Sequence, residues 1–474
     1  MNYKNILFYL GFYALLVSIL SIINILYSIY FDFILGINIY LITFVISLII
    51  SFVFLYIGYP NYKNISFIEQ MFFIFLGFLL IPLLLTIPYY LSIYDISFLN
   101  AYFESVSGFT TTGFSIINNV SYYDEPFLLW RSSSQWLGGL FFLASIIGTL
   151  GNNQIKIKPI YLVYSGAAGR NFYSNFSYNI IRIILIYLFS TILIIFLFTI
   201  TGIRLLDAFN LSLTAISSGG FLSTNYLSDI INDDIQTLIL SASLLLPVFN
   251  FYLLFNIFTK KFNFNNHQED IHLALLILIL TLFFYFLIIP YEGFFEVLLA
   301  ISSSVSTSGI SIYSSNFDIS LFLILLTIIG GSLISTSSGF KYVRFYILLK
   351  ISYNEIYRIV KPTNIFNKNL FTSESKIEEE DFMISFLVFI LFIISLFILS
   401  SILSFDNLNF ENSFKLSILT LTNTVNSSLF GMESINFLDL EIFTKVFLIF
   451  FMVLGRIEII SFFYIFKKLI FKDY

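Results

Sequence analysis

Ten runs of about 20 mostly apolar residues recur along this chain of 474 residues, and they restrict its fold more than any other feature. Each run is long enough for a helix that crosses the hydrocarbon core of a membrane. Charged residues make up only 11% of the chain, against roughly 25% in soluble domains, which leaves too few to cover a water-facing surface. The sequence therefore predicts an all-α membrane protein with about ten transmembrane helices, at residues 6–30, 37–58, 67–92, 126–150, 178–201, 234–258, 271–290, 318–350, 382–403 and 437–465.

The residue types and motifs that are missing exclude several classes of function. The chain has no Cys, which excludes thiol nucleophiles, disulfides and thiolate metal sites. Its two His residues, His267 and His272, lie in or beside a short polar loop, which argues against a zinc or iron site. The sequence contains no HExxH or GxGD protease motif and no GxxxxGK[ST] phosphate-binding loop. We therefore expect neither an enzyme nor a bound cofactor, and the absence of a basic stripe argues against a nucleic-acid partner.

The distribution of basic residues predicts the orientation of the chain. In the ten-span arrangement, the loops on one side carry most of the Lys and Arg residues, whereas the opposite side carries only Arg204 and Lys415. Cytoplasmic loops are the ones enriched in Lys and Arg. Both termini are therefore predicted to lie in the cytoplasm.

Four segments between the apolar runs share one pattern. They lie near residues 97–116, 204–223, 293–312 and 408–427, and they are too polar to cross lipid alone but too apolar for ordinary loops. Aligned on their last small residue, they end at Gly113, Gly220, Gly309 and, in place of a glycine, Val425. Thirteen residues earlier stand residues suited to the start of a helix: Asn100, Asp207, Glu296 and Asn412. About ten helical residues span roughly 15 Å, or half of the membrane core, so each segment is predicted to be a half-crossing helix with a return strand.

Hydroxyl-bearing residues precede most of these final positions. Backbone that is not helical is tolerated at membrane depth only where it is buried in protein or lines a watery cavity. Four copies around one axis would let carbonyl oxygens replace the hydration shell of a cation. Glycine would allow the positive φ that turns these carbonyl groups inward. The half-helices would direct their negative C-terminal ends at the membrane centre. The predicted selectivity-filter residues are Thr110, Thr111, Thr112, Gly113, Ser217, Ser218, Gly219, Gly220, Ser306, Thr307, Ser308, Gly309, Thr422, Asn423, Thr424 and Val425.

The alternative interpretation is that these clusters of Ser, Thr and Gly are ordinary helix-packing surfaces. A single cluster would favour that alternative. Three glycine-ended copies and a fourth that ends in valine, all in one register and on one predicted face of the membrane, favour a cation-selective pore.

The repeat and its neighbouring motifs resemble the Trk/Ktr/HKT superfamily of potassium transporters, and the two extra N-terminal runs resemble those of its TrkH-type branch. The resemblance covers most of the chain and rests on SGFTTTGFS (107–115), WRSSSQWLGG (130–139), AISSGGF (215–221), SSVSTSGIS (303–311), GGSLISTSSGFKYVR (330–344) and LGRIEII (454–460). It implies two additional helices at residues 1–64, followed by four pore repeats at residues 65–155, 156–262, 263–360 and 361–474.

The same resemblance implies potassium uptake across the cytoplasmic (inner) membrane. K+ would then bind at Thr111, Thr112, Ser218, Gly219, Thr307, Ser308, Asn423 and Thr424. The resemblance also implies a homodimer and a cytosolic nucleotide-binding regulatory subunit of the TrkA/KtrA kind.

Two departures from the family pattern keep other functions open. The fourth repeat reads TNTVN where the family has a glycine, and Val425 is poorly suited to positive φ, so we expect a distorted fourth filter strand. The segment SLISTSSG lacks one or two small residues of the family pattern. In this family a serine at the position of Gly113 is associated with sodium permeation, so the glycine favours potassium. A sodium-permeable or weakly selective transporter and a non-conducting regulatory relative remain the alternatives.

A polar interruption and two cations in apolar runs predict a gate. GGSLISTSSG (330–339) interrupts a long apolar run and indicates an unwound segment. Arg456 is expected to reach the pore below the filter and, by family resemblance, to contact this segment. We hypothesise an intramembrane gate formed by Gly330, Gly331, Ser335, Thr336, Gly339, Lys341 and Arg456.

Three further charged residues and one acidic segment lie outside the predicted filter and gate. Arg131 lies near the start of its run, which favours a side chain that reaches the outer membrane surface. Glu104 either adds negative potential at the mouth of the pore or accepts from buried backbone donors behind the filter. Lys415 is expected to point away from the cation path. The acidic segment ESKIEEED (374–381) is either a solvated face or a contact for a regulatory partner.

Overall fold

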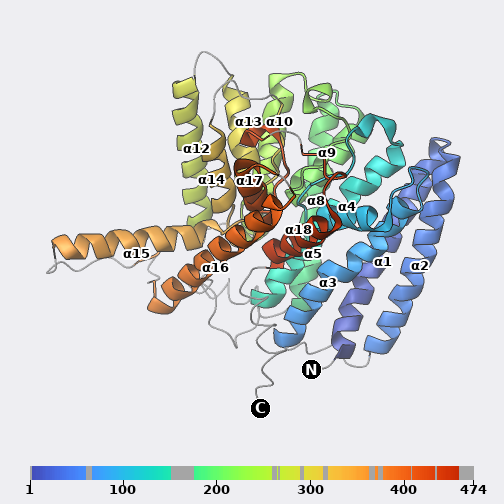
Figure 1. The fold of residues 1–474 in the computed structure, drawn as a ribbon, viewed down its shortest axis with the longest axis horizontal. Helices are drawn as coiled ribbons and strands as arrows, with labels where there is room; N and C mark the ends of the chain where they lie inside the picture. The colour runs from blue at the N-terminus through green and yellow to red at the C-terminus, as the bar shows by residue number, and fades with distance from the viewer. Residues whose placement is uncertain are drawn as a thin grey trace.

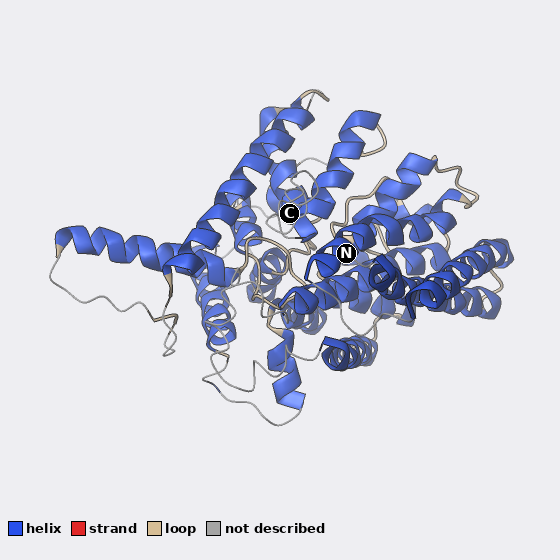
Figure 2. Ribbon diagram, turned by 90° about the horizontal axis from the view of Figure 1, so that it is seen from below, coloured by secondary structure: helices blue, strands red, loops and turns tan. Residues whose placement is uncertain are grey.

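The computed structural model describes residues 3–59, 67–150, 176–258, 264, 267–288, 293–312, 319–361, 369–371, 377–406, 408–432 and 435–457. This part of the chain consists of helices and the loops that join them, and it contains no β-strand (Figure 2). The predicted all-α fold is therefore confirmed. The basic residues 156, 158 and 170, residues 374–376 of the acidic segment, and residues 458–465 of the last predicted span lie outside the described residues.

Six helices in the described part of the chain are long and apolar enough to cross a membrane. They are α1 (Tyr3–Tyr30), α2 (Ile34–Gly58), α3 (Phe67–Tyr90), α8 (Phe176–Ile200), α12 (Gln268–Ile288) and α16 (Glu379–Ser404). Their outer faces expose large apolar side chains, such as Ile192 and Phe196 of α8, a surface that suits lipid. The α1–α2 pair lies at one side of the bundle (Figure 1). The total of ten spans stays a prediction.

Four shorter helices occupy the predicted half-crossing segments. They are α4 (Phe98–Phe109), α9 (Leu205–Ser217), α13 (Phe294–Val305) and α17 (Phe410–Leu421). The residues expected at the start of each helix are not the capping residues. Each of them is instead the third helical residue: Asn100, Asp207, Glu296 and Asn412. The capping positions are occupied by Ser97, Arg204, Gly293 and Asn409. The shift is the same in all four helices, so the predicted register of the repeat was correct.

The four short helices are joined by four further helices into a closed ring of contacts. These are α5 (Glu125–Leu150), α10 (Asp234–Leu245), α14 (Ser320–Ile329) and α18 (Ile442–Ile457). Each packs against the next short helix along the chain: α5 against α9, α10 against α13, α14 against α17, and finally α18 back against α4. The short helices therefore surround a common centre, with the four repeats in chain order around it and the fourth beside the first.

The predicted helix at residues 234–258 is wrong as a single element. After α10 the chain turns through η4 (Leu246–Val248) and continues as α11 (Phe251–Phe258), with a bend of 104°. Pro247 has no backbone N–H to continue a helix, and the Oδ1 atom of Asn250 accepts from the backbone N–H of Tyr252 at 2.9 Å. Pro247 was the local signal for this break, although the hydropathy of the run did not reveal it.

The predicted interruption at residues 330–339 is confirmed. Helix α14 ends at Ile329, and α15 (Tyr342–Val360) begins after a loop of residues 330–341. Helix α15 runs ten residues beyond the end of the predicted span and points away from the bundle, as both ribbon views show (Figures 1 and 2). The two helices are thus separate elements rather than one kinked span.

Glycines let two of the ring helices approach the ends of the short helices closely. A Cβ atom on Gly138 of α5 would lie 1.8 Å from the carbonyl oxygen of Phe109, the last residue of α4. A Cβ atom on Gly455 of α18 would lie 2.4 Å from the carbonyl oxygen of Leu421, the last residue of α17. The same close approach therefore recurs at the ends of the first and fourth short helices.

Gly138→Ala is expected to lower the melting temperature of the detergent-solubilised protein, because the added methyl group must push α4 and α5 apart. Overpacking of this kind costs about 1–3 kcal/mol. Gly36→Ala is the matched control, since a Cβ atom there lies 3.5 Å from Cε2 of Tyr40 and meets nothing closer. Equal melting temperatures for the two variants would contradict the close approach.

Candidate functional site

All four short helices end in the same backbone conformation. The residue two places before each final glycine or valine has a left-handed backbone: Thr111 (φ 58°), Ser218 (φ 57°), Thr307 (φ 61°) and Asn423 (φ 48°). The N–H of the following residue bonds to the carbonyl oxygen five positions earlier, as in Thr112 to Ser107 and Thr424 to Leu419, both within 3.0 Å. Glycine normally occupies the left-handed position of such a helix end, so the conformation is strained at four equivalent places.

The glycine positions themselves differ from the prediction. Gly113 (φ 80°) and Gly309 (φ 68°) adopt positive φ, but Gly220 and Val425 do not. The expected distortion of the fourth strand from a valine with positive φ is therefore wrong. At this position φ is positive in the first and third repeats but not in the second and fourth. Valine therefore occupies one of the two places where positive φ does not strain an L-residue.

The segments that follow the short helices meet one another. The Nδ2 atom of Asn423 donates to Oγ1 of Thr112 at 3.0 Å, which joins residues 311 positions apart. A Cβ atom on Gly220 would lie 2.6 Å from the carbonyl oxygen of Ser308 and 2.7 Å from Cβ of Val425. The structure thus brings the predicted filter residues of all four repeats into one cluster.

Most hydroxyl groups in this cluster bond within their own segment. Thr110 and Thr422 donate to the helix carbonyl oxygens of Val106 and Ile418 at 2.7 and 2.9 Å. Ser217 and Ser306 likewise donate to carbonyl oxygens three or four residues earlier. A fixed hydroxyl at the end of each short helix makes the return segment rigid. Backbone carbonyl oxygens are then the principal groups left for a ligand.

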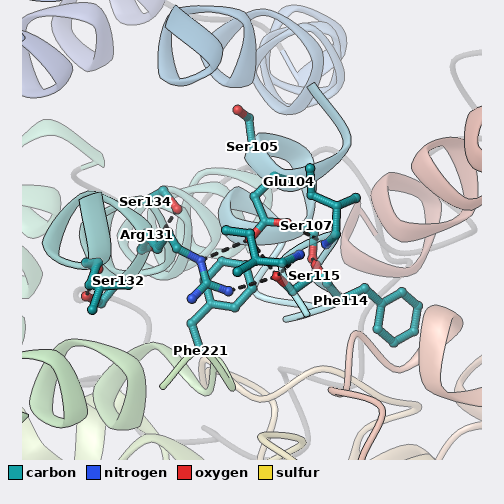
Figure 3. Close-up of polar contacts among 12 residues, drawn as sticks. Glu104, Ser105, Ser107, Phe114, Ser115, Arg131, Ser132, Ser134 and Phe221 are labelled. Carbon is teal, nitrogen blue, oxygen red and sulfur yellow. Dashed lines mark hydrogen bonds and ion pairs between the residues drawn. The ribbon is translucent and has the colours of Figure 1, made fainter. Parts of the chain in front are cut away.

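A buried ion pair supports the first return segment from behind (Figure 3). Nε of Arg131 lies 3.0 Å from Oε1 of Glu104, and the two side chains are 3% and 0% exposed. The carboxylate also accepts from the N–H of Ile116 and from the hydroxyl of Ser115, at 2.9 and 3.0 Å. The Arg131 guanidinium lies 4.2 Å from the centre of the Phe221 ring, which belongs to the second repeat.

These contacts decide between the interpretations of both charges. The expectation that Arg131 reaches the outer membrane surface is wrong, because its side chain is buried against Glu104 and Phe221. Glu104 accepts a hydrogen bond from the backbone N–H of Ile116, which agrees with the interpretation that it accepts from buried backbone donors. The sequence did not reveal this pairing because the two residues are 27 positions apart on different helices.

Gln135 is a residue of the cluster that the sequence reasoning did not single out. Its Oε1 atom accepts from Oγ1 of Thr214 at 2.7 Å and from the N–H of Phe221 at 3.2 Å. A Cβ atom on Gly219 would lie 2.2 Å from the same oxygen. Gln135 therefore supports the second return segment as Glu104 supports the first, and its place in WRSSSQWLGG was the available signal.

The loop of residues 330–341 is held against the bend between α10 and α11. The N–H groups of Ser332 and Thr336 donate to the carbonyl oxygens of Val248 and Pro247, at 2.9 and 3.1 Å. In return, the N–H of Phe251 donates to the carbonyl oxygen of Ile334 at 2.9 Å. The helix break that the sequence reasoning missed therefore supplies backbone partners for the predicted gate.

The same loop touches the filter cluster. Oγ1 of Thr336 donates to the carbonyl oxygen of Ile216 at 3.0 Å and lies 3.0 Å from the hydroxyl of Ser218. The N–H of Ser338 donates to Oγ1 of Thr307 at 3.1 Å. Both contacts reach residues with left-handed backbone, so the loop lies directly beside the ends of the second and third short helices.

Two buried cations hold this loop. Nζ of Lys341 donates to the carbonyl oxygen and the hydroxyl of Ser335, at 3.4 and 3.0 Å, and to the carbonyl oxygen of Ser337 at 2.6 Å. Nη1 of Arg456 donates to the hydroxyl of Ser338, while its Nε and Nη2 atoms find no hydrogen-bond partner among the described residues. The Arg456 guanidinium lies 3.9 Å from the centre of the Phe142 ring. The predicted contact between Arg456 and the loop is therefore present.

Acidic residues at the start of α12 extend this contact. Oε1 of Glu269 accepts from the N–H of Leu333 in the loop, and Oδ1 of Asp270 accepts from the N–H of Asn250 in the helix break, both at 2.9 Å. Neither residue was predicted as part of the site. Among the described residues, no group of three or more His, Asp or Glu side chains forms a metal site.

Lys415 lies beside the fourth short helix and is neutralised there. Its Nζ atom is 2.6 Å from a carboxylate oxygen of Glu411 and donates to the carbonyl oxygen of Gly431 at 2.9 Å. Both partners are outside the filter cluster. This agrees with the expectation that the cation points away from it.

Comparisons with known proteins find relatives in sequence and in structure. The chain is 30% identical to an uncharacterized cation transporter of Methanocaldococcus jannaschii over 420 residues, which cover 86% of this chain and 84% of the relative. It is 27% identical to the Trk system potassium uptake protein TrkG of Escherichia coli, covering 77% of each chain. The crystal structure of the potassium transporter TrkH from Vibrio parahaemolyticus matches 98% of both chains with a TM-score of 0.84 at 21% identity, a likeness of fold. No protein-family profile matches the chain.

Proposed function

Because the chain belongs to the Trk/Ktr family of potassium transporters, as a TrkH-type membrane subunit, we propose that this multi-pass membrane protein takes up K+ through its filter cluster. The observation that carries the proposal is the identical helix end in all four repeats, with left-handed residues that converge on one centre. Four repeats of span, half-helix and span would then surround one pore, preceded by two additional helices. Both termini would lie in the cytoplasm.

The chemistry of this centre suits a dehydrated monovalent cation. The carboxyl ends of four helices carry partial negative charge and point to the same place. Backbone carbonyl oxygens would replace water around K+, and Glu104 and Gln135 would keep the return segments in position. A membrane potential of 100 mV, negative inside, favours inward movement of one such ion by about 2.3 kcal/mol. Uptake therefore needs no ATPase within the chain.

The loop of residues 330–341 would be the gate. It contacts Ser218 and Thr307 of the cluster, and the cations Arg456 and Lys341 donate to the same loop. A buried cation beside the path repels K+. Movement of the loop away from the break between α10 and α11 would open the path.

The first test of the proposed function is K+ uptake by reconstituted vesicles, with growth of potassium-uptake-deficient cells on low potassium as the cellular readout. Gly113→Ser is expected to abolish K+ uptake or shift it toward Na+, because a side chain there meets Cγ2 of Val425 at 2.8 Å and Gly113 has a φ of 80°. Gly202→Ser is the matched control, since Gly202 also has positive φ but a Cβ atom there meets nothing within 4 Å.

Equal K+ and Na+ uptake by the wild-type protein would instead favour a weakly selective transporter. Val425 is the observation that favours this second candidate, because it replaces the glycine of the fourth repeat. An expressed wild-type protein that carries neither ion would favour a non-conducting relative.

We also propose, from the family alone, a homodimer with a cytosolic nucleotide-binding subunit, which co-purification from the native membrane would test.

A further inference from the structure

The side chain of Val425 touches the glycines of all three other repeats. A Cβ atom on Gly113 would lie 2.8 Å from Cγ2 of Val425, and one on Gly309 would lie 2.7 Å from its Cγ1. A Cβ atom on Gly220 would lie 2.7 Å from Cβ of Val425. These separations are too short for two side chains, so the valine methyl groups occupy the space that the three glycines leave free.

The contact with Gly220 shows how far this side chain reaches. The ring of helix contacts places the fourth repeat between the third and the first, so the second repeat lies diagonally opposite Val425. A residue that belonged only to the wall of the ring would touch its two neighbours, Gly113 and Gly309. Val425 also touches the residue on the far side, so its isopropyl group crosses the centre.

We propose that the Val425 side chain is a plug in the glycine ring, which limits the flux of K+ and the size of the cation that passes. This rests on the proposed function, because it assumes that the ring lies on the ion path. An apolar group at the centre provides no oxygen for a dehydrated ion and leaves no room for a hydrated one. Passage then requires the fourth segment to withdraw its side chain.

The surroundings of Val425 allow that movement. Its own position is only half-buried, and the residues that follow it, Asn426 and Ser427, are also half-buried. Its backbone does not have the positive φ that strains Asn423 two residues earlier. Val425 is thus joined to the strained helix end on its N-terminal side and to a half-buried segment on its C-terminal side.

The test is a size series at this position, measured as Rb+ and Cs+ flux into vesicles of one lipid composition at equal protein content. Flux is expected to rise several-fold in Val425→Ala and further in Val425→Gly, to fall in Val425→Ile, and to include Cs+ in Val425→Gly. Val120→Gly is the matched control, because Val120 lies in η2 (Val120–Tyr122), where its backbone N–H bonds to Oδ1 of Asn225 in an exposed contact. Each variant is also made in a protein that lacks residues 332–338, so that the loop does not limit the flux.

The outcomes separate this inference from the proposed function. A wild-type protein that carries Rb+, together with a series in which flux does not depend on side-chain size, overturns the plug and leaves K+ uptake in place. Flux no higher than that of empty vesicles in every variant and in both backgrounds overturns both. If Val425→Gly does not fold, Val425→Ala and Val425→Ile still test the plug, because alanine is smaller than valine and isoleucine is larger.

Discussion

Deletion of residues 332–338 is expected to raise basal cation flux by about tenfold or more. Lys341 donates hydrogen bonds to Ser335 and Ser337 of the loop, and Arg456 donates one to Ser338. Hydrogen bonds to charged groups contribute about 1.5–3 kcal/mol each. Loss of 1.4 kcal/mol from a closed state shifts its equilibrium about tenfold. Flux of Rb+ into reconstituted vesicles measures the effect.

The geometry of the loop makes this deletion feasible. A Cβ atom on Gly330 would lie 3.4 Å from Cα of Gly339, and the N–H of Phe340 bonds to the carbonyl oxygen of Ile328 at 2.8 Å. The ends of the loop therefore already meet, and removal of the residues between them leaves little to rebuild. A deletion variant that melts and elutes like the wild-type protein but shows unchanged flux would show that the loop is not the barrier.

A double-mutant cycle locates the effect at one contact. Arg456→Gln and Ser338→Ala are each expected to raise flux, and their combination should raise it no further than the larger single effect, because both remove the same bond. Arg182→Gln is a control at another arginine of the membrane region, on α8, which contacts the Phe255 ring rather than the loop. Additive effects of the two substitutions would mean that Arg456 acts elsewhere.

Arg131→Met is expected to destabilise the folded protein by about 3–5 kcal/mol, because it leaves the carboxylate of Glu104 buried without its counter-charge. Addition of Glu104→Gln should recover much of the loss, since the double variant buries no unpaired charge. Thermal melting in detergent, followed by tryptophan fluorescence, provides the measurement. If the proposed K+ uptake is correct, the destabilised variant should also carry more Na+ relative to K+ than the wild-type protein, because Glu104 holds Ile116 in the first return segment.

Glu296→Gln is the matched control for this prediction. Glu296 is a carboxylate at the start of the third short helix, at the position aligned with Asn100, and it accepts from the N–H of Gly293 at 3.2 Å in an exposed contact. An exposed contact of this kind contributes little, so the melting temperature should change by a small fraction of the effect at Arg131. Similar losses at both sites would show that burial of the Glu104–Arg131 pair does not govern its contribution.

Local patterns were sufficient to predict the repeated elements of this fold. The apolar runs indicated the long helices, and the polar residues at Asn100, Asp207, Glu296 and Asn412 indicated the short ones in the correct register. The small and hydroxyl-bearing residues at 330–339 indicated the break before α15. These features follow from the length of an apolar run and from the conformations that each residue type permits, which are properties of neighbouring residues.

Contacts between distant segments decided the remainder. The sequence did not show that Arg131 pairs with Glu104, that Pro247 and Val248 accept hydrogen bonds from the loop, or that Val425 fills the space beside three glycines. It also assigned positive φ to the glycines, whereas the constant left-handed residues are Thr111, Ser218, Thr307 and Asn423. The sequence alone determined the membrane environment and the fourfold register. Only the tertiary structure determined which charge is neutralised and which side chain occupies the centre, because each depends on atoms that the chain brings together from different repeats.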